Sequence, residues 1–328
     1  MLDGFGRKID YLRISVTDRC NFRCQYCMSE KMTFMPKNEL LTLEEICLIA
    51  ERFISHGVKK IRLTGGEPLV RRDMQDVIKR LGRKVETGEL DELTLTTNGS
   101  LLTEYAEHLA VNNVRRINVS LDILDPDKFA EITRGTKVAE VLAGMKSANH
   151  AGIRVKINMV ALRDFNQDAL IPMVEYCAEE GHDLTVIETM PMGDVGADRK
   201  LEHISAQEFI APLSNHYSLS PIEHRSAGPA RYMAVEPLGL RLGLITPLSH
   251  NFCDDCNRLR LTTDGKIFMC LGHNAHVDLR AAVRNEGVGA VDQLLSKALK
   301  LKPLRHEFND QLYGSAEILE RHMNVTGG

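Results

Sequence analysis

The stretch Asp10-Tyr-Leu-Arg-Ile-Ser-Val-Thr-Asp-Arg-Cys20 begins as a regular apolar pattern and ends at a cysteine. Leu12, Ile14 and Val16 alternate with polar residues, and this period of two predicts a β-strand over 11–17. Cys20 follows in the polar loop that leaves the strand. In barrels of parallel strands, the loops at the carboxyl ends of the strands hold the active site. The sequence therefore predicts that the chemistry of this chain begins directly after its first strand.

The same order of strand and helix recurs along the following part of the chain. Thr42 and Glu45 match a capping box, which predicts a helix that ends near Gly57, ahead of a strand over 59–64. Asp125 followed by Pro126 predicts another helix start. Further patterns predict strands over 92–97, 114–121, 153–160 and 184–188, and helices over 103–112, 138–150 and 167–180. Strands that alternate with helices predict an α/β fold with a parallel sheet.

Two architectures fit this alternation, a barrel-like arc and a doubly wound open sheet. Polar or glycine-containing stretches follow the predicted strands, where barrels hold their active sites, so we favour the arc. After Met190 the alternation fades, and Pro and Gly concentrate over 220–229. We therefore predict two domains, a partial barrel over 1–225 and a smaller domain over 226–328.

The composition limits the class of protein. Hydrophobic residues make up 43% of the 328 residues and charged residues 26%, which is typical of a folded globular chain. The formal net charge of −4 disfavours a general duplex-binding protein. No apolar run is long enough to span a membrane, and charged residues near the N-terminus argue against a signal peptide. We expect a cytoplasmic protein.

Three cysteines lie together in Cys20-Asn-Phe-Arg-Cys24-Gln-Tyr-Cys27. A structural zinc site normally uses four protein ligands, and the next histidine, His56, falls within a predicted helix. Three thiolates can instead hold a four-iron, four-sulfur cluster whose remaining iron is open to an outside ligand. An incomplete zinc knuckle or a set of core cysteines is the alternative.

The spacing C-x3-C-x2-C, with Tyr26 before its last cysteine, resembles the first motif of the radical S-adenosylmethionine (SAM) superfamily. Gly65-Gly-Glu-Pro68 is similar to the second motif of that superfamily. The resemblance implies a partial (βα)6 barrel of the TIM type. It also implies that the amine and carboxylate of SAM chelate the open iron, and that one electron from the cluster cleaves a carbon–sulfur bond to release a 5′-deoxyadenosyl radical. A glycine pair would let the main chain approach this zwitterion closely.

Cys253-Asp-Asp-Cys256 and Cys270 form a second set of cysteines. His273 follows three residues later, so C-x2-C-x13-C-x2-H also matches a Cys3His zinc site. The spacing alone leaves zinc and an iron–sulfur cluster open. The two cysteine sets together resemble the GTP 3′,8-cyclase (MoaA) family of molybdenum cofactor biosynthesis, over about Gly4 to Gly328. Supporting stretches are 10–20, 61–68, Thr96-Thr-Asn-Gly99, Asn118-Val-Ser-Leu-Asp122, Cys256-Asn-Arg-Leu-Arg260 and Gly228-Pro-Ala230.

This resemblance implies a lyase with two [4Fe-4S] clusters and SAM, which converts GTP to (8S)-3′,8-cyclo-7,8-dihydroguanosine 5′-triphosphate. The 5′-deoxyadenosyl radical would remove the 3′ hydrogen of the ribose, and the resulting carbon radical would attack C8 of guanine. The implied partners are an electron donor and cyclic pyranopterin monophosphate synthase, which takes the product, with no nucleic acid and no membrane. The chain would be a monomer or a homodimer.

The resemblance also implies roles for individual residues. The ligands of the catalytic first cluster would be Cys20, Cys24 and Cys27, and those of a second cluster, whose open iron meets guanine, would be Cys253, Cys256 and Cys270. The SAM contacts would be Tyr26, Gly66, Ser120 and Met190. The GTP contacts would be Arg13, Arg62, Thr96, Lys156, Arg258 and Arg260. The terminal Gly327-Gly328 would reach the active site.

Arg258 and Arg260 can also be interpreted from the residues themselves. They flank Leu259 in a strand-like alternation, so both guanidinium groups face the same side and could bind phosphate oxygens bidentately. The alternative is a solvated surface pair. No G-x4-G-K-[ST] stretch is present, so we expect side chains to bind the nucleotide without a phosphate loop, and we expect no GTP hydrolysis.

Two other functions are alternatives, a peptide-modifying radical SAM enzyme with an auxiliary cluster and a zinc-stabilised nucleic-acid-binding module. The net charge and the lack of tryptophan disfavour the second. The chain departs from the family at Ser29, where proline usually follows Cys-Met, and His273 would remove the guanine-binding iron if it were a ligand. Cys47 and Cys177 lie on apolar helical faces and are predicted to be core thiols.

Overall fold

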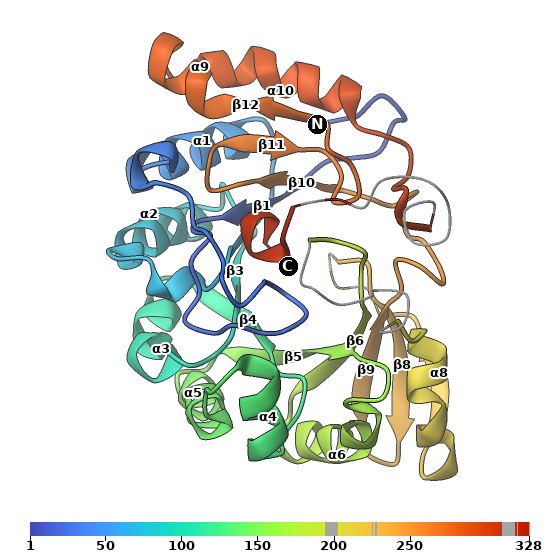
Figure 1. The fold of residues 1–328 in the computed structure, drawn as a ribbon. Coiled ribbons are helices and arrows are strands. Elements are labelled where there is room, and N and C mark those ends of the chain that lie inside the picture. Colours follow the sequence, from blue (N-terminus) through green and yellow to red (C-terminus); the bar gives the residue numbers. More distant parts are fainter. Residues whose placement is uncertain (194–202, 225, 227, 310–318, 320, 328) are drawn as a thin grey trace.

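The computed structural model of the chain describes residues 1–193, 203–224, 226, 228–309, 319 and 321–327. The described strands form one 12-stranded sheet, which curves into an open arc with helices on its outer side (Figure 1). The strand order is β12-β11-β10-β1-β2-β3-β4-β5-β6-β9-β8-β7. This arrangement confirms the predicted α/β fold with a partial barrel and C-terminal elements added to it.

The central strands of the sheet are parallel. They are β1 (Tyr11–Ser15), β2 (Lys60–Thr64), β3 (Glu92–Thr97), β4 (Val114–Ser120), β5 (Arg154–Ala161) and β6 (Asp183–Glu188), extended by β10 (Arg258–Leu261) and β9 (Leu240–Ile245). The outer strands pair antiparallel and are β11 (Lys266–Phe268), β12 (His276–Asp278), β8 (Arg231–Glu236) and β7 (Ser218–Ile222). Each strand predicted before Met190 is present.

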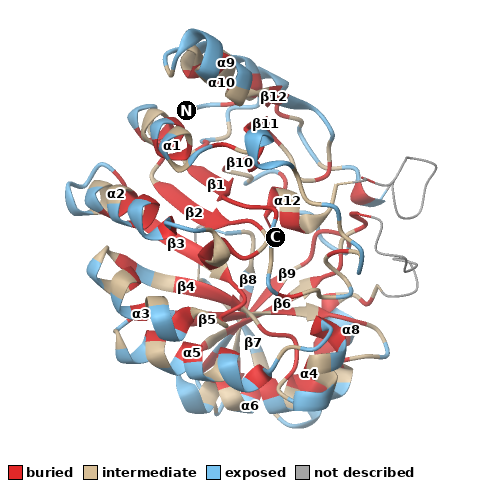
Figure 2. Ribbon diagram, turned by 60° about the vertical axis from the view of Figure 1, so that its left-hand side comes forward, coloured by how far each residue is buried: buried red, intermediate tan, exposed pale blue. Residues whose placement is uncertain are grey.

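The helices begin at the predicted caps. Thr42 and Glu45 form both hydrogen bonds of a capping box, and the Asp125 carboxylate accepts the main-chain N–H of Asp127 and Lys128. The α-helices are α1 (Leu43–Ser55), α2 (Met74–Glu86), α3 (Leu102–Val111), α4 (Pro126–Thr133), α5 (Val138–His150), α6 (Leu170–Glu180), α8 (Ala206–Ile210), α9 (Leu279–Glu286), α10 (Ala290–Leu301) and α12 (Met323–Thr326). Short 3₁₀ helices are η1 (Lys37–Glu39), η2 (Pro68–Val70), η3 (Gln167–Ala169) and η4 (Ala211–Asn215). Figure 2 shows buried strands behind helices whose outer faces are exposed.

Strand β1 is buried on both faces, and one of these faces lines the functional site. Leu12 and Ile14 belong to the hydrophobic core, while Tyr11 and Arg13, on the opposite face, line a cavity inside the arc. The apolar alternation predicted the strand, but it gave no sign that the polar face is also buried. Cys47 and Cys177 are buried in α1 and α6, as predicted.

The C-terminal part of the chain lies beside the first strands. Strand β10 pairs with β1, and α10 is tied to α1 by Asp292, whose carboxylate contacts Arg52 and His56. Helix α12 packs on β1, and the described chain ends inside the arc (Figure 1). The predicted boundary between two domains, at residues 225 and 226, stays a prediction. Among the described residues, no helix is long and apolar enough to cross a membrane.

Candidate active site

Two adjoining cavities lie inside the arc. The first is lined by the cysteines of the loop after β1, and the second is lined by the C-terminal cysteines and a group of cations. The residues that line both cavities are Asn158, Ile187, Met190 and Met323. A ligand in one cavity is therefore next to a ligand in the other.

Cys20, Cys24 and Cys27 all line the first cavity. Cys20 Sγ accepts hydrogen bonds from the Phe22 main-chain N–H at 3.3 Å and from Asn98 Nδ2 at 3.7 Å. Burial raises the pKa of Cys20 to about 12 and that of Cys24 well above its ordinary value. These thiols are protonated at neutral pH, and a bound metal cluster would displace their protons. Three cysteines on one wall of a cavity fit the donor set of a [4Fe-4S] cluster with one open iron.

The Gly65-Gly66 pair packs against the cysteine-bearing loop. A Cβ atom would lie 2.3 Å from the Thr17 carbonyl oxygen if added to Gly65, and 2.1 Å from the Arg19 carbonyl oxygen if added to Gly66. The Gly66 N–H donates to the Thr17 carbonyl at 2.8 Å. Close packing of two main-chain segments thus already requires glycine here. Both glycines also line the first cavity, where the predicted approach to SAM stays a prediction.

Glu67 of the same motif is fully buried and joins neighbouring loops. Its carboxylate accepts hydrogen bonds from the Asn98 main-chain N–H at 2.6 Å, from the Thr97 hydroxyl at 2.8 Å and from the Leu69 N–H at 3.0 Å. Burial raises the pKa of Glu67 to about 7. Because its oxygens are occupied by protein donors, we interpret Glu67 as a residue that fixes the rim of the first cavity.

The four residues predicted to contact SAM come together. Tyr26, Gly66, Ser120 and Met190 all line the first cavity. The Tyr26 hydroxyl donates to Asp122 Oδ2 at 2.8 Å, which holds the ring at the cavity wall. Their contact with SAM stays a prediction.

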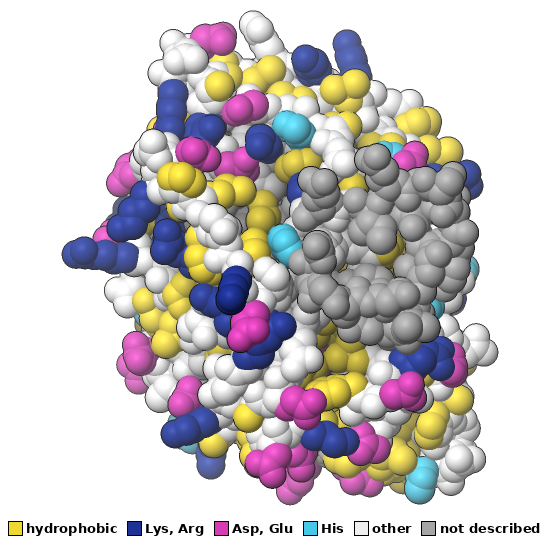
Figure 3. Space-filling view, in the orientation of Figure 1, with side chains coloured by type: hydrophobic (Ala, Val, Ile, Leu, Met, Phe, Trp, Pro, Cys, Tyr) yellow, Lys and Arg dark blue, Asp and Glu magenta, His cyan; other side chains and the backbone are white. Residues whose placement is uncertain are grey.

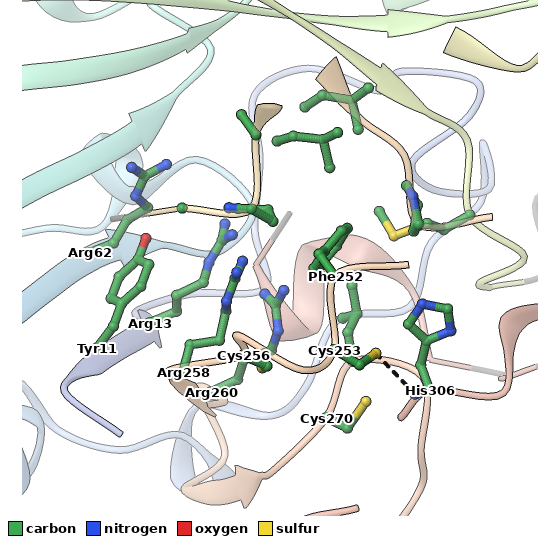
Figure 4. A pocket seen from close by; sticks show the side chains of 18 of the residues that line it. Tyr11, Arg13, Arg62, Phe252, Cys253, Cys256, Arg258, Arg260, Cys270 and His306 are labelled. Atoms are coloured by element: carbon green, nitrogen blue, oxygen red, sulfur yellow. Dashed lines mark hydrogen bonds between the residues drawn. The ribbon is translucent and has the colours of Figure 1, made fainter. Parts of the chain in front are cut away.

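Strand register brings cations of β2, β1 and β10 together. Arg13 is the register partner of Arg62 in β2 and of Arg260 in β10. The row two positions earlier consists of Lys60, Tyr11 and Arg258. Residues two apart in a strand point to the same side, so both rows face the second cavity (Figure 4).

The arginines of this group have few counter-ions. Among the described residues, no carboxylate forms an ion pair with Arg62, Arg258 or Arg260. The nearby Glu92 pairs with Lys60 and Arg116 instead. The Nε atoms of Arg62 and Arg258 are buried without a hydrogen-bond partner in the described chain. Burial, followed by the charge of Arg258, lowers the pKa of Arg260 to about 10. Buried positive charge of this kind is suited to a polyanionic ligand. Arg258 and Arg260 are 8% and 7% exposed, so they are not a solvated surface pair.

Tyr11 lies in the middle of the cations. Its ring centroid is 5.1 Å from Lys60 Nζ and 6.0 Å from the Cζ atoms of Arg62 and Arg258. Burial alone would raise the pKa of Tyr11, but Arg62 and the other cations lower it to about 8. The electron-rich face of the ring thus holds neighbouring positive charges together.

Lys156 and Thr96 complete the set predicted to contact GTP. Lys156 lines the second cavity, and its Nζ donates to the Tyr232 hydroxyl at 2.6 Å. Burial, followed by the charge of Arg62, lowers the pKa of Lys156 to about 7. Thr96 lines the first cavity and meets the cations through its hydroxyl oxygen, which accepts from Arg62 Nη1 at 3.2 Å.

Cys253, Cys256 and Cys270 line the second cavity. Figure 4 shows Cys253, Cys270 and His306 at the end of the cavity away from Arg13 and Arg62. Phe252 lies between the two groups, with its ring centroid 5.7 Å from Arg258 Cζ. The His306 main-chain N–H donates to Cys253 Sγ at 3.4 Å. The second cavity therefore has a cationic end and an end rich in sulfur and aromatic rings.

A buried lysine supports the second cysteine set. Lys302 Nζ donates to Cys256 Sγ at 3.4 Å and to the main-chain carbonyls of Arg258 at 3.1 Å and Met269 at 2.6 Å. Burial alone would raise the pKa of Cys256, but Lys302 and Arg258 lower it to about 7. A thiolate is thus easily formed at Cys256. Burial raises the pKa of Cys253 and Cys270, so a bound cluster would have to displace their protons.

His273 does not line the second cavity. Its Nε2 atom lies 2.9 Å from the Arg305 carbonyl oxygen, and its Nδ1 lies 4.0 Å from Glu307. The structure thus gives no support to the Cys3His zinc alternative.

Sequence reasoning missed several residues of these cavities. Lys60 could have been found, because it stands two positions before Arg62 in one strand. Tyr11 was part of the quoted first strand, but nothing local showed that cations would surround it. Lys302 and His306 reach the second cysteine set only through the tertiary fold, so no local signal marks them.

The C-terminal tail reaches the cationic cavity. Arg260 Nη1 donates to the Gly327 carbonyl oxygen at 2.9 Å. Gly328 lies outside the described residues. Of the pair Gly327-Gly328, which was predicted to reach the active site, the structure therefore describes Gly327 alone.

Comparison with known proteins finds two family models and relatives that cover the whole chain. Residues 14–177 match the Radical SAM superfamily, and residues 182–308 match the Molybdenum Cofactor Synthesis C family. A GTP 3′,8-cyclase of Rhizobium meliloti is 52% identical over 329 residues, covering 100% of this chain and 94% of the relative. One from Brucella canis is 49% identical, with 100% and 96% covered. The structure of Streptococcus suis SuiB bound to S-adenosylmethionine has a similar fold, with a TM-score of 0.62, 17% identity, 86% of this chain covered and 65% of that chain spanned.

Proposed function

The chain belongs to the GTP 3′,8-cyclase family of radical SAM enzymes that serve molybdenum cofactor biosynthesis, and on this premise we propose how its two cavities divide the reaction. The enzyme cyclises GTP by joining the ribose C3′ to C8 of guanine. Family membership implies a [4Fe-4S] cluster and SAM. The second cluster, the site residues and the protein partners belong to the proposal.

The first cavity holds the radical-generating group. Cys20, Cys24 and Cys27 bind the first cluster, and Tyr26, Gly66, Ser120 and Met190 form the walls around SAM. The cluster and SAM supply a 5′-deoxyadenosyl radical when bound. The buried thiols and the close-packed glycine pair support this assignment, because they give a rigid site shielded from water.

The second cavity binds GTP. The triphosphate lies at the cationic end, against Arg13, Arg62, Lys156, Arg258 and Arg260, while Thr96 acts through Arg62. Cys253, Cys256 and Cys270 would hold a second [4Fe-4S] cluster at the other end, where it would bind guanine, and the Phe252 ring lies between that end and Arg258. Arginine forks bind phosphate oxygens bidentately, and an aromatic ring offers the base an apolar surface.

The shared wall of the two cavities is the observation on which this proposal mainly depends. Asn158, Ile187, Met190 and Met323 line both cavities, so a ribose between triphosphate and base can lie against the SAM side. Holding two reactants at contact distance supplies a large part of the rate enhancement. The protein's own role is therefore positioning and exclusion of water.

The proposal is tested with anaerobically reconstituted enzyme, SAM, dithionite and GTP carrying deuterium at C3′. We expect a product isomeric with GTP, resolved by chromatography and mass spectrometry, and transfer of the deuterium to 5′-deoxyadenosine. Deuterium retained in the nucleotide would contradict the proposed geometry. An electron donor and cyclic pyranopterin monophosphate synthase are the proposed protein partners, the latter as acceptor of the product.

A further inference from the structure

Lys302, which comes directly after α10, has a buried side chain. Lysine side chains usually lie at the surface, where Figure 3 shows them in dark blue with those of arginine, but Lys302 is only 2% exposed. It lines neither of the two cavities, in contrast to Lys60 and Lys156. Lys302 therefore has no direct contact with a ligand in these cavities.

The contacts of Lys302 require a full positive charge. Its Nζ lies within hydrogen-bond distance of three acceptors, which are Cys256 Sγ at 3.4 Å and the main-chain carbonyl oxygens of Arg258 at 3.1 Å and Met269 at 2.6 Å. Only the ammonium form of lysine has three N–H donors. No carboxylate of the described residues forms an ion pair with this ammonium. A buried charge needs a counter-ion, and the group in contact that can supply one is the Cys256 thiolate.

The charge of Lys302 acts on all three cysteines of the second set. Burial raises the pKa of Cys253 and of Cys270, and the charge of Lys302 opposes that rise at both. At Cys256, Lys302 is the largest of the effects that oppose burial. One buried cation thus favours the thiolate form of each ligand proposed for the second cluster.

The first cysteine set has different surroundings. Cys20 Sγ accepts hydrogen bonds from neutral donors, the Phe22 main-chain N–H and Asn98 Nδ2. Burial raises the pKa of Cys20, and the charge of Glu67 adds to that rise. A cluster on the first set would therefore have a carboxylate near it, whereas a cluster on the second set would have a buried ammonium.

The N-terminal segment fixes the chain that carries Lys302. Arg7 Nη2 donates to the Pro303 carbonyl oxygen at 2.6 Å, and Arg7 Nη1 donates to the Cys253 carbonyl oxygen at 2.8 Å. Arg7 is itself held by Asp3, whose carboxylate accepts from Nε at 2.7 Å. The main chain next to Lys302 is thus joined to the main chain of a cysteine in the second set.

We propose that Lys302 is the counter-ion of the second cluster and raises its reduction potential through the hydrogen bond to Cys256. This inference rests on the proposed assignment of Cys253, Cys256 and Cys270 as cluster ligands. Lys302 is a positioning and tuning residue, because it acts on the cluster through a ligand and does not touch the substrate.

The sign of the effect follows from the charges. Three thiolates outweigh the positive charge of an oxidised cluster core, so the cluster is anionic and becomes more so when it gains an electron. A neighbouring ammonium stabilises the reduced form more than the oxidised form, and net charge and hydrogen bonds to sulfur are known determinants of cluster potentials. The same cation draws electron density from iron, which makes the open iron a stronger Lewis acid for guanine.

The experiment compares variants that separate charge from packing. Lys302→Met removes the charge and the three donors but keeps a long side chain, whereas Lys302→Arg keeps the charge. Lys300→Met is the matched control, since Lys300 is exposed in the last turn of α10. Anaerobically reconstituted enzymes, without SAM or GTP, are titrated with dithionite and mediator dyes and followed by electron paramagnetic resonance. Cys270→Ala identifies the signal of the first cluster.

Each step of this titration moves one electron from dithionite to a cluster. No bond is broken, and Lys302 keeps its proton. In Lys302→Met, reduction of the second cluster should become less favourable by about tenfold or more, a decrease in potential of about 59 mV or more for one electron. Lys302→Arg should lie closer to the wild type than to Lys302→Met, and Lys300→Met should match the wild type. The potential of the first cluster should be the same in every variant, because its ligands line the other cavity.

A wild-type potential of the second cluster in Lys302→Met, or an equal decrease in Lys302→Arg, would overturn the proposed role of Lys302. If Lys302→Met does not bind the second cluster, Lys302→Gln takes its place with the same expected decrease, since glutamine keeps a donor but no charge. Loss of the second cluster from Lys302→Gln and Lys302→Arg alike would show a packing role and would also overturn the proposal. A wild-type protein with about four iron atoms and one zinc would instead overturn the proposed second cluster itself.

Discussion

Arg260 donates a hydrogen bond from Nη1 to the main-chain carbonyl oxygen of Gly327 at 2.9 Å. This contact joins the end of the described chain to the cations of the second cavity. The tail is held from the other side as well, because Asn324 Nδ2 donates to the Asp18 carbonyl at 2.7 Å. Since Met323 lines both cavities, the tail is part of the wall between the proposed SAM and GTP sites.

Gly327→Ala should therefore impair GTP turnover. Gly327 has a φ of +73°, and a Cβ there would lie 2.2 Å from Thr64 Cγ2, so alanine would displace the tail from Arg260. We expect turnover to fall by about tenfold or more, because small displacements of positioning groups have large effects. Gly88→Ala is the matched control, since Gly88 has a similar φ of +76° but open space around it. Equal turnover in the two variants would show that the tail contact has no role.

The arginines can be tested by their contribution to GTP affinity. Arg258→Ala and Arg260→Ala should each weaken GTP binding by about 1.5–3 kcal/mol, because a charge-assisted contact with phosphate is lost. Cleavage of SAM without GTP should survive in both. Calorimetry gives the affinities, with the exposed Arg154→Ala as control. Wild-type affinity in both variants would remove the arginines from the proposed GTP site.

These arginines also show how far the sequence could predict the site. The alternation around Leu259 correctly placed Arg258 and Arg260 on one face of a strand. That they meet Arg13 and Arg62 depends on the pairing of β10 with β1, which joins segments from opposite ends of the chain. No local period encodes that pairing. The βα repeat and its caps were predictable because their signals are local, whereas Lys302 became a neighbour of Cys256 only on folding.

GTP affinity should depend on pH through Lys156. Its pKa is lowered to about 7 by burial, then by Arg62 and Arg116, with Lys60 adding to this effect and Asp183 opposing it. Lys156 is thus mostly charged at pH 6 and mostly neutral at pH 7.5, and the neutral amine attracts phosphate less. We expect affinity to fall about fourfold over this range, with proton uptake on binding at the higher pH.

Lys156→Arg keeps the positive charge across the same range, and GTP itself ionises identically with both proteins. Any slope that the variant retains therefore belongs to the nucleotide or to another group of the site, such as Tyr11 with its pKa of about 8. Calorimetry in buffers of different ionisation enthalpy measures the proton uptake. The same slope in both proteins would show that Lys156 does not titrate in the free enzyme at these pH values.

Tyr11 should hold the cations in place for GTP. Its ring is close to Lys60, Arg62 and Arg258, and each such contact contributes about 0.5–1 kcal/mol or more when buried. Tyr11→Leu should weaken GTP binding about fivefold with little change in kcat, whereas Tyr11→Phe should remain near the wild type. Binding titrations and steady-state kinetics at pH 7 separate the two effects. A common loss in both variants would assign the role to the hydroxyl group.

Variants in the two cysteine sets should affect radical formation and substrate binding separately. Reconstituted wild-type protein should bind about eight iron atoms per chain, because two sets of three cysteines are present. Cys24→Ala should abolish cleavage of SAM with or without GTP, since one of three thiolates at the first cluster is lost. Cys270→Ala should retain the first cluster, because its ligands line the other cavity. Uncoupled formation of 5′-deoxyadenosine should then continue while the cyclised nucleotide disappears.

His273→Ala decides the nature of the second site. His273 Nε2 lies 2.9 Å from the Arg305 carbonyl, and the ring does not line the cavity of the cysteines. We therefore expect iron content and product yield near those of the wild type, measured by metal analysis and chromatography. Loss of metal from this variant, with about four iron atoms and one zinc in the parent, would restore the Cys3His zinc site. A zinc site there would exclude the proposed binding of guanine to an iron of a second cluster. The arginines and Lys156 would then be the groups that hold GTP.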